Sequence, residues 1–177
     1  MRNVKRLSKP VSLKTNAARW TRDLLSKIEE CKHNKTEVPD AFYSHYNQND
    51  VKERLKEMYN SLCCYCEGRI GVVEFGHIDH RRPKKKFPKD TYNWKNLHLG
   101  CTRCNTMKGE KYLEKYPILD AVKDKIPEHL TYDINRRGVW PEARTKRGET
   151  TIQHTDLTDE KLRNNWSEVF NDARTDK

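Results

Sequence analysis

The chain has 177 residues, of which 34% are hydrophobic and 35% are charged, and its formal net charge is +10. A chain of this length can form one domain, but so polar a composition predicts a core that is small or shared with a partner. The positive charge favours an anionic partner such as nucleic acid, although a run of charges can also be a solvated surface.

The sequence has no stretch of roughly 20 apolar residues that would form a transmembrane helix, and its N-terminus has no apolar signal-peptide core. We therefore expect a cytoplasmic protein with no membrane contact. In that reducing compartment, the six cysteines favour metal binding over a disulfide framework.

Two helices are predicted before the first metal-type cysteine. The first should begin after Asn16 as its cap, and the second should cover residues 50–62 with Asp50 and Glu53 as its cap. Apolar residues recur at helical spacing in both segments. They are Ala17, Trp20, Leu24, Ile28 and Cys31 in the first segment, and Val51, Leu55, Tyr59 and Leu62 in the second.

Four cysteines form two Cys-x-x-Cys pairs, Cys63 with Cys66 and Cys101 with Cys104. Thiolates at this spacing suit a closed tetrahedral site, so we predict one structural zinc ion bound by all four. The alternatives are four buried thiols or a redox pair. Cys64 can replace Cys63 only by shortening the turn between the two ligands.

The 34 residues between Cys66 and Cys101 exceed the spacing of a compact zinc ribbon, which predicts a folded element within the zinc clamp. Residues 72–80 and 96–100 are suited to two strands, and a helix is predicted from Cys104 onward. Zinc would then hold two strands and a helix together at their ends.

The C-terminal part has fewer signals. Between Tyr132 and His154 the sequence is basic and lacks apolar periodicity, so we expect a loop with a short hairpin near Gly138. A last helix is predicted from about residue 158. Its apolar face would consist of Leu162, Trp166, Val169 and Phe170.

Several motifs resemble those of the HNH endonucleases, whose catalytic unit is the ββα-metal fold. They are His77-Ile78-Asp79-His80, Asn96-Leu97 and Cys101-x-x-Cys104-Asn105-x-x-Lys108-Gly109. Others resemble the PtuB-like HNH subunits of Septu-type bacterial phage defence, to which retron-associated effectors are related. These motifs are Cys-x-Tyr-Cys-Glu at 63–67, His-Ile-Asp-His-x-Arg-Pro-Lys at 77–84 and Tyr-x-Trp-x-Asn-Leu at 92–97.

The predicted elements and this resemblance together indicate an α+β protein with a ββα-metal (HNH) core and flanking helices. Residues 1–62 would form a helical N-terminal region, residues 63–116 the nuclease core with its four-cysteine zinc site, and residues 117–177 a basic loop and a helix.

Phosphodiester hydrolysis needs a base for the attacking water and a cation that stabilises the leaving oxygen. His80 suits the first role, because a neutral imidazole titrates close to working pH. Asp79 and Asn105 offer oxygen ligands for Mg²⁺, Mn²⁺ or another divalent cation, and His77 is a further candidate ligand. Strict strand alternation predicts that Asp79 and His80 point to opposite faces.

The resemblance assigns the same roles to these residues. It also implies that Asn96 holds the loop that orients His80, and that Lys108 contacts a phosphate. The basic run after His80 would lie beside the nucleic-acid backbone without reading its sequence. Its candidate contacts are Arg81, Arg82 and Lys84.

These residues favour a metal-dependent nuclease that acts on DNA or RNA. A non-catalytic nucleic-acid-binding module or an interaction subunit would explain the cysteines and the charge, but would leave Asp79, His80, Asn96 and Asn105 without a role. The resemblance further implies antiviral defence, a PtuA-like ATPase partner of the ABC/SMC type, and a retron reverse transcriptase with its nucleic acid as another candidate partner. The first and last helices would either bind such a partner or pack on the core.

Overall fold

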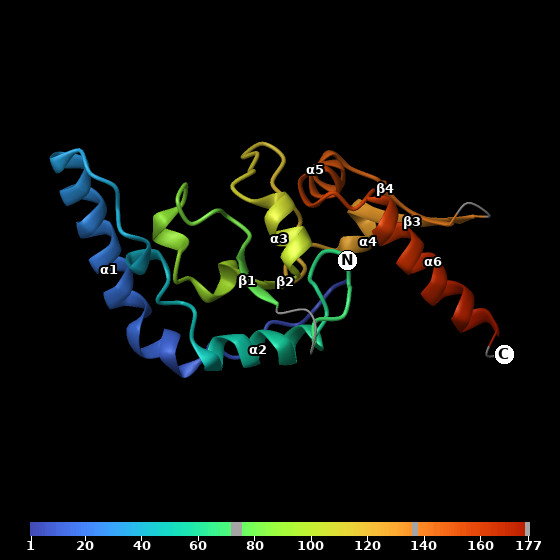
Figure 1. Cartoon of the computed structure of the whole chain (residues 1–177), viewed down its shortest axis with the longest axis horizontal. Coiled ribbons are helices and arrows are strands. Elements are labelled where there is room, and N and C mark those ends of the chain that lie inside the picture. Colours follow the sequence, from blue (N-terminus) through green and yellow to red (C-terminus); the bar gives the residue numbers. More distant parts are fainter. Residues whose placement is uncertain (72–75, 136–137, 176–177) are drawn as a thin grey trace.

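The computed structural model in Figure 1 describes residues 1–71, 76–135 and 138–175. Its helices are α1 (Val11–Asn34), α2 (Asn49–Tyr59), α3 (Thr102–Lys108), α4 (Ile126–His129), α5 (Lys146–Thr155) and α6 (Glu160–Thr175), with short 3-10 turns η1 (Asp40–Tyr43), η2 (Pro88–Asp90) and η3 (Trp94–Asn96). Its strands are β1 (His77–His80), β2 (Leu97–Gly100), β3 (Leu130–Asn135) and β4 (Gly138–Ala143). The described helices include none long and apolar enough to cross a membrane.

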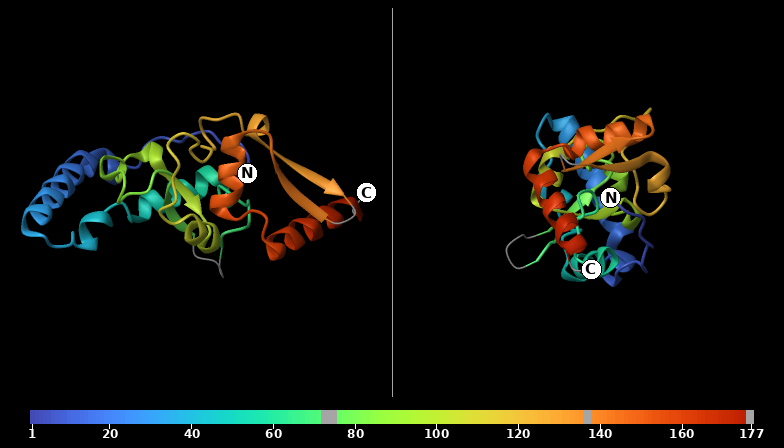
Figure 2. Two further views of the ribbon diagram at one scale, coloured as in Figure 1. Left: turned by 90° about the horizontal axis from the view of Figure 1, so that it is seen from above. Right: turned by 90° about the vertical axis from the view of Figure 1, so that its right-hand side faces the viewer.

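The molecule is elongated, with α1 at one end and the β3–β4 hairpin with α6 at the other (Figure 2). Each pair of consecutive strands, β1 with β2 and β3 with β4, forms an antiparallel two-stranded sheet. The ββα unit of β1, β2 and α3 lies between the two ends (Figure 1). The predicted α+β class with flanking helices is confirmed.

Helix α1 begins earlier than predicted, at Val11, and Asn16 lies inside it instead of capping it. Its first turn is capped from α2, because Ser12 donates from N and Oγ to the Asp50 carboxylate at 2.9 and 2.7 Å. Asp50 therefore binds the neighbouring helix, and its predicted role as the cap of α2 is wrong. The contact fixes α2 against the start of α1.

Helix α2 ends at Tyr59, before the predicted Leu62, because Asn60 adopts a left-handed conformation with φ of 52°. The chain then turns directly into the first cysteine pair. Leu62 forms an isolated bridge with Arg69 instead of lying on the helix. Met58 joins the buried face of α2, which the apolar spacing did not include.

The ββα core is close to the prediction. Of the predicted first strand, residues 72–75 lie outside the described residues, and β1 begins at His77. In the β1–β2 register, Asp79 pairs with His98 and His80 with Leu97. Helix α3 follows β2 after Cys101, which acts as its N-cap by accepting a hydrogen bond from Cys104 N.

The prediction of a loop between Tyr132 and His154 is wrong at its C-terminal end, because helix α5 begins at Lys146. The face that α5 buries is made mainly of small and hydroxyl residues, including Gly148, Thr151 and Thr155, with Ile152 as its apolar member. Its threonine hydroxyls bond within the helix, as Thr155 does to Thr151 O at 2.7 Å. A Cβ at Gly148 would lie 2.1 Å from His129 O, so this position requires glycine. Such a face produces no apolar periodicity.

The C-terminal end agrees with the remaining expectations. Strands β3 and β4 pair as an antiparallel hairpin in which Gly138 is paired with Asn135, and the last helix begins at Glu160. Leu162 and Trp166 of α6 pack against the core, and Trp166 Nε1 donates to Cys66 O at 3.0 Å. Helix α6 is thus attached to the cysteine cluster. The side chains of Val169 and Phe170, predicted on the same face, lie outside the described residues.

Candidate active site and metal centre

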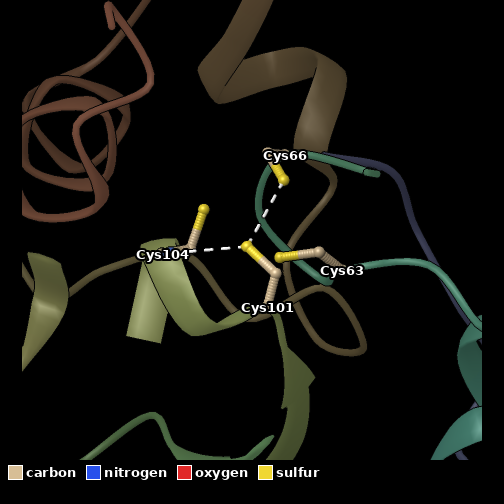
Figure 3. A group of neighbouring side chains, drawn as sticks. All are labelled: Cys63, Cys66, Cys101 and Cys104. Atoms are coloured by element: carbon tan, nitrogen blue, oxygen red, sulfur yellow. Dashed lines mark hydrogen bonds between the residues drawn. The ribbon is translucent and has the colours of Figure 1, made fainter. Parts of the chain in front are cut away.

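The four cysteines of the predicted zinc site lie together. The Sγ atoms of Cys63, Cys66, Cys101 and Cys104 are all within 4.8 Å of one another, and all four residues are buried (Figure 3). The Sγ atoms of Cys66 and Cys101 are 3.8 Å apart. Zn–S bonds of about 2.3 Å place the sulfurs of a tetrahedral site about 3.8 Å apart, so the cluster can hold a zinc ion.

Hydrogen bonds within the cluster act differently on its thiols. Those from Cys101 and Cys104 lower the pKa of the Cys63 thiol well below its ordinary value, whereas those with Cys101 raise the pKa values of the Cys66 and Cys104 thiols. Three backbone N–H groups also donate to cluster sulfurs, which favours thiolates. These bonds run from Tyr65 N to Cys63, from Gly68 N to Cys66 and from Cys104 N to Cys101.

Cys64 and Cys31 are not part of the cluster. Burial raises the pKa of the Cys64 thiol well above its ordinary value, which keeps it protonated. Its backbone N donates to Leu99 O at 2.8 Å and so joins the cysteine turn to β2. Cys31 is buried in α1, as expected for a packed helix residue.

A cavity of about 210 Å³ lies beside the ββα unit. Five of the sequence-predicted site residues line it, together with residues from the N-terminal region and from the turn after α3. The lining residues are Tyr46, Ile78, Asp79, His80, Pro83, Lys84, Lys85, Asn105, Lys108, Gly109 and Glu110.

The Asp79 carboxylate is deeply buried, with only 2% of the residue's surface exposed. Its Oδ2 accepts a hydrogen bond from Tyr65 OH at 2.7 Å, and its Oδ1 lies 2.9 Å from the Lys108 ammonium. Lys108 also donates to His80 O at 2.6 Å. The lysine predicted to contact phosphate is thus bound to the strand that carries both candidate catalytic residues.

His80 is also buried, and its Nε2 lies 2.8 Å from Thr91 O. Since a carbonyl oxygen only accepts, Nε2 carries the proton and Nδ1 carries the lone pair. Burial lowers the pKa of His80 to about 4, so the imidazole is neutral at pH 7. Both Asp79 and His80 reach the same cavity, although they bond to different elements.

Asn96 ties down the loop between β1 and η2. Its side-chain oxygen accepts from Arg82 N at 2.8 Å, and its amide donates to Arg82 O and to Asp90 O at 3.0 and 3.1 Å. Asp90 precedes Thr91, whose carbonyl orients His80. Asn96 is therefore linked to His80 through Asp90 and Thr91, in the way that the predicted role of Asn96 requires.

Of the other two predicted metal ligands, Asn105 lies beside Asp79 and His77 does not. A Cβ at Gly100 would lie 3.5 Å from the Asp79 Cβ and 3.7 Å from the Asn105 Cβ, so these two side chains flank one glycine. His77 is exposed, does not line this cavity, and lies 3.1 Å from the Thr102 hydroxyl. The structure brings Asp79 and Asn105 together and leaves His77 outside.

The basic run after His80 divides into two groups. Arg81 donates to Ile118 O at 3.0 Å, and Arg82 pairs with Asp90 at 2.6 Å, so both hold protein segments together. Lys84 and Lys85 line the cavity instead. Lys85 was not among the predicted contacts, and only its place in the run could have indicated it.

Positive charge extends from the cavity toward the end of α5. Burial lowers the pKa of His154, and the nearby charges of Lys111, Lys108 and Lys86 lower it further. Neither Lys86 nor Lys111 has an ion-pair partner in the described part of the chain. A surface of this kind attracts phosphates.

Tyr65 and Tyr46 are the functional candidates that sequence reasoning missed. Tyr65 lies within a quoted cysteine motif, but nothing in the spacing showed that its hydroxyl reaches Asp79. Tyr46 packs on His80 from the N-terminal region, with 4.5 Å between ring centroids. No local signal marks it, because the contact spans 34 positions of the sequence.

An antiparallel strand pair followed by a helix, with an Asp–His pair beside a cavity, is the arrangement of an HNH nuclease domain, and residues 63–111 match the HNH endonuclease family. The chain is also similar to two proteins named Septu protein PtuB. The one from Bacillus thuringiensis is 36% identical over 81 residues, which cover 45% of this chain and 32% of that protein.

The second relative, from Bacillus mycoides (strain KBAB4), is 28% identical over 153 residues, which cover 67% of this chain and 52% of that protein. The chain thus spans about a third and about half of the length of these relatives. The resemblance to HNH proteins of the Septu type is confirmed, and residues 63–111 carry the matching domain.

Proposed function

We propose that this protein is a divalent-metal-dependent endonuclease that hydrolyses phosphodiester bonds in DNA or RNA. The observation that carries the proposal is the convergence of Asp79, His80 and Asn105 on one cavity with two lysines of the basic run. A non-catalytic nucleic-acid-binding module would need the lysines, but it would not need a buried neutral histidine beside a carboxylate.

His80 is the general base of this proposal. With its Nε2 proton donated to Thr91 O, the lone pair on Nδ1 can accept a proton from the attacking water. The imidazolium that results is stabilised by the negative charge of the adjacent phosphate. Asn96 keeps the ring in this tautomer and orientation, because it fixes the loop that ends at Thr91.

Asp79 and Asn105 are the proposed metal ligands. The two hydrogen bonds that the Asp79 carboxylate accepts leave about two of its four lone-pair sites for a cation. Carboxylate and amide oxygens suit Mg²⁺ or Mn²⁺. When bound, the cation would neutralise charge on the leaving oxygen.

The four-cysteine cluster is proposed to hold a structural zinc ion, separate from the catalytic cation. All four positions of a tetrahedral site would be filled by sulfur, which leaves no position for water or substrate. Zinc would fix the turn after α2 to the start of α3, and so the position of Asn105 relative to Asp79.

The role in defence and the partner are proposed from the relatives. Similarity to Septu protein PtuB supports a function in bacterial antiviral defence, and we propose control by a PtuA-like ATPase of the ABC/SMC type. Retron components are a further candidate partner on the resemblance alone. Co-expression with the ATPase, followed by size exclusion and mass measurement with and without ATP, tests the complex; two separate peaks would contradict it.

The nuclease proposal is tested by incubating purified protein with DNA and RNA in Mg²⁺, Mn²⁺ or EDTA, alone and with the ATPase. We expect cleavage of at least one nucleic acid that EDTA abolishes. Cleavage that persists in EDTA would contradict the metal dependence. Binding without cleavage under every condition would favour the non-catalytic module.

A further inference from the structure

Tyr46 brings the N-terminal region into the candidate active site. It lies in the turn between η1 and α2, outside residues 63–111 that match the HNH family. Its ring packs edge-on against the His80 imidazole, with 4.5 Å between centroids and an interplanar angle of 82°. It lines the same cavity as Asp79 and His80.

The turn that carries Tyr46 is held by aromatic packing. The ring of His45 stacks on Trp20 of α1 with 5.5 Å between centroids, and Trp20 packs against Tyr92 at the same distance. The Tyr92 hydroxyl donates to Phe42 O. Tyr46 is therefore fixed in place by the protein itself, before any ligand binds.

Lys84 determines where the Tyr46 hydroxyl proton can point. The Lys84 ammonium lies 3.3 Å from Tyr46 OH and 3.4 Å from Tyr43 O. An ammonium group only donates, so the Tyr46 oxygen is the acceptor and its proton is available to another group. The pair thus presents an ammonium and a phenol proton at the cavity, both of which bind anionic oxygen.

We infer that Tyr46 and Lys84 together bind a nonbridging oxygen of the phosphate beside His80, so that the N-terminal region completes the active site. This inference rests on the proposed nuclease function and adds a substrate contact to it. Because negative charge on that oxygen increases as water attacks, the contact stabilises the transition state more than the bound substrate.

The test compares Tyr46→Phe with Tyr43→Phe. Tyr46→Phe removes the hydroxyl but keeps the ring against His80, so the cleavage rate at saturating nucleic acid should fall about 10-fold or more. The melting temperature and the affinity for uncut nucleic acid in EDTA should stay close to those of the wild type. Tyr43→Phe removes a hydroxyl three positions earlier, from a side chain that does not line the cavity, and should cut at the wild-type rate.

Lys84→Met, alone and combined with Tyr46→Phe, tests whether the two groups act on one oxygen. If they do, the fold-reduction in cleavage rate of the double variant should be smaller than the product of the fold-reductions of the two single variants. A Tyr46→Phe protein that cuts at the wild-type rate, or losses that simply multiply, would overturn this inference while the nuclease function stands. A wild-type protein that cuts neither DNA nor RNA, alone or with the ATPase, would overturn the nuclease function itself.

Discussion

The Lys108 ammonium lies 2.9 Å from a carboxylate oxygen of Asp79, and both side chains are only 2% exposed. The same ammonium donates to His80 O, so one buried lysine joins α3 to the strand that carries the candidate metal ligand and base. Removing one member of a buried ion pair costs about 3–5 kcal/mol, because the other charge stays buried without its partner.

We therefore predict that Asp79→Asn and Lys108→Met each lower the free energy of unfolding by about 3–5 kcal/mol. The double variant should be more stable than the sum of the two losses implies, because no unpaired charge remains. Urea unfolding of the wild type, the two single variants and the double variant gives the coupling free energy between Asp79 and Lys108. Simple additivity would show that the pair contributes little. Any loss of activity in Asp79→Asn should be interpreted together with its stability.

His80→Ala should reduce cleavage by about 10²–10⁴-fold, the usual contribution of a general base. It should also cost about 1–3 kcal/mol of stability, because Thr91 O loses its buried donor. Rates should therefore be measured well below the melting temperature, and nucleic-acid binding should change little.

The matched control for His80→Ala is His33→Ala, which changes an exposed histidine in the last turn of α1. His77→Ala addresses the candidate ligand that lies outside the cavity, and we expect its metal dependence to match the wild type. Wild-type cleavage by His80→Ala would mean that the assigned mechanism is wrong.

Cys101→Ser should reduce bound zinc and lower the melting temperature by roughly 10 °C, because metal binding is coupled to folding. Cys64→Ser is the matched control, since Cys64 is also buried beside the cluster but is not one of its four candidate ligands. Elemental analysis and thermal unfolding give the two readouts. Well-folded wild-type protein without zinc would remove the proposed zinc site.

Asp124 offers a pH test of the C-terminal packing. Burial favours a raised pKa, but the hydrogen bonds from Arg147 and Asp120 N outweigh it, so the pKa of Asp124 lies below its ordinary value of 3.8. Arg147 binds both carboxylate oxygens, at 2.9 and 2.5 Å. A carboxylate with a lowered pKa stabilises the fold above the ordinary pKa and loses this contribution as the pH falls through the folded-state value.

Asp124→Asn should thus lower the free energy of unfolding by about 1–2 kcal/mol at neutral pH. The difference in this free energy between the variant and the wild type should become smaller below pH 3.8. Glu149→Gln is the control, because Glu149 pairs with Lys146 at an exposed position. Thermal unfolding across this pH range is the measurement. A difference that stays constant with pH would contradict the assignment to the carboxylate.

The sequence by itself determined the elements whose signals are local. The two Cys-x-x-Cys pairs predicted a cluster that the structure confirms, because each pair needs only one tight turn to bring two sulfurs together. The strand that ends at His80 followed from residue type and spacing, and so did a helix in the second cysteine pair, although α3 begins at Thr102 and not at the predicted Cys104. The apolar stripes of α2 and α6 were found for the same reason, since they repeat with the helical period.

The tertiary structure decided contacts between segments that are distant in the sequence. Asp50 caps α1 instead of its own helix, because the two helices meet at their N-termini. Helix α5 buries glycine, threonine and a single isoleucine, and close packing of Gly148 on His129 takes the place of an apolar stripe. Tyr46 reaches His80 only because aromatic packing of α1 holds its turn there. These contacts depend on how elements pack in three dimensions, which no local spacing records.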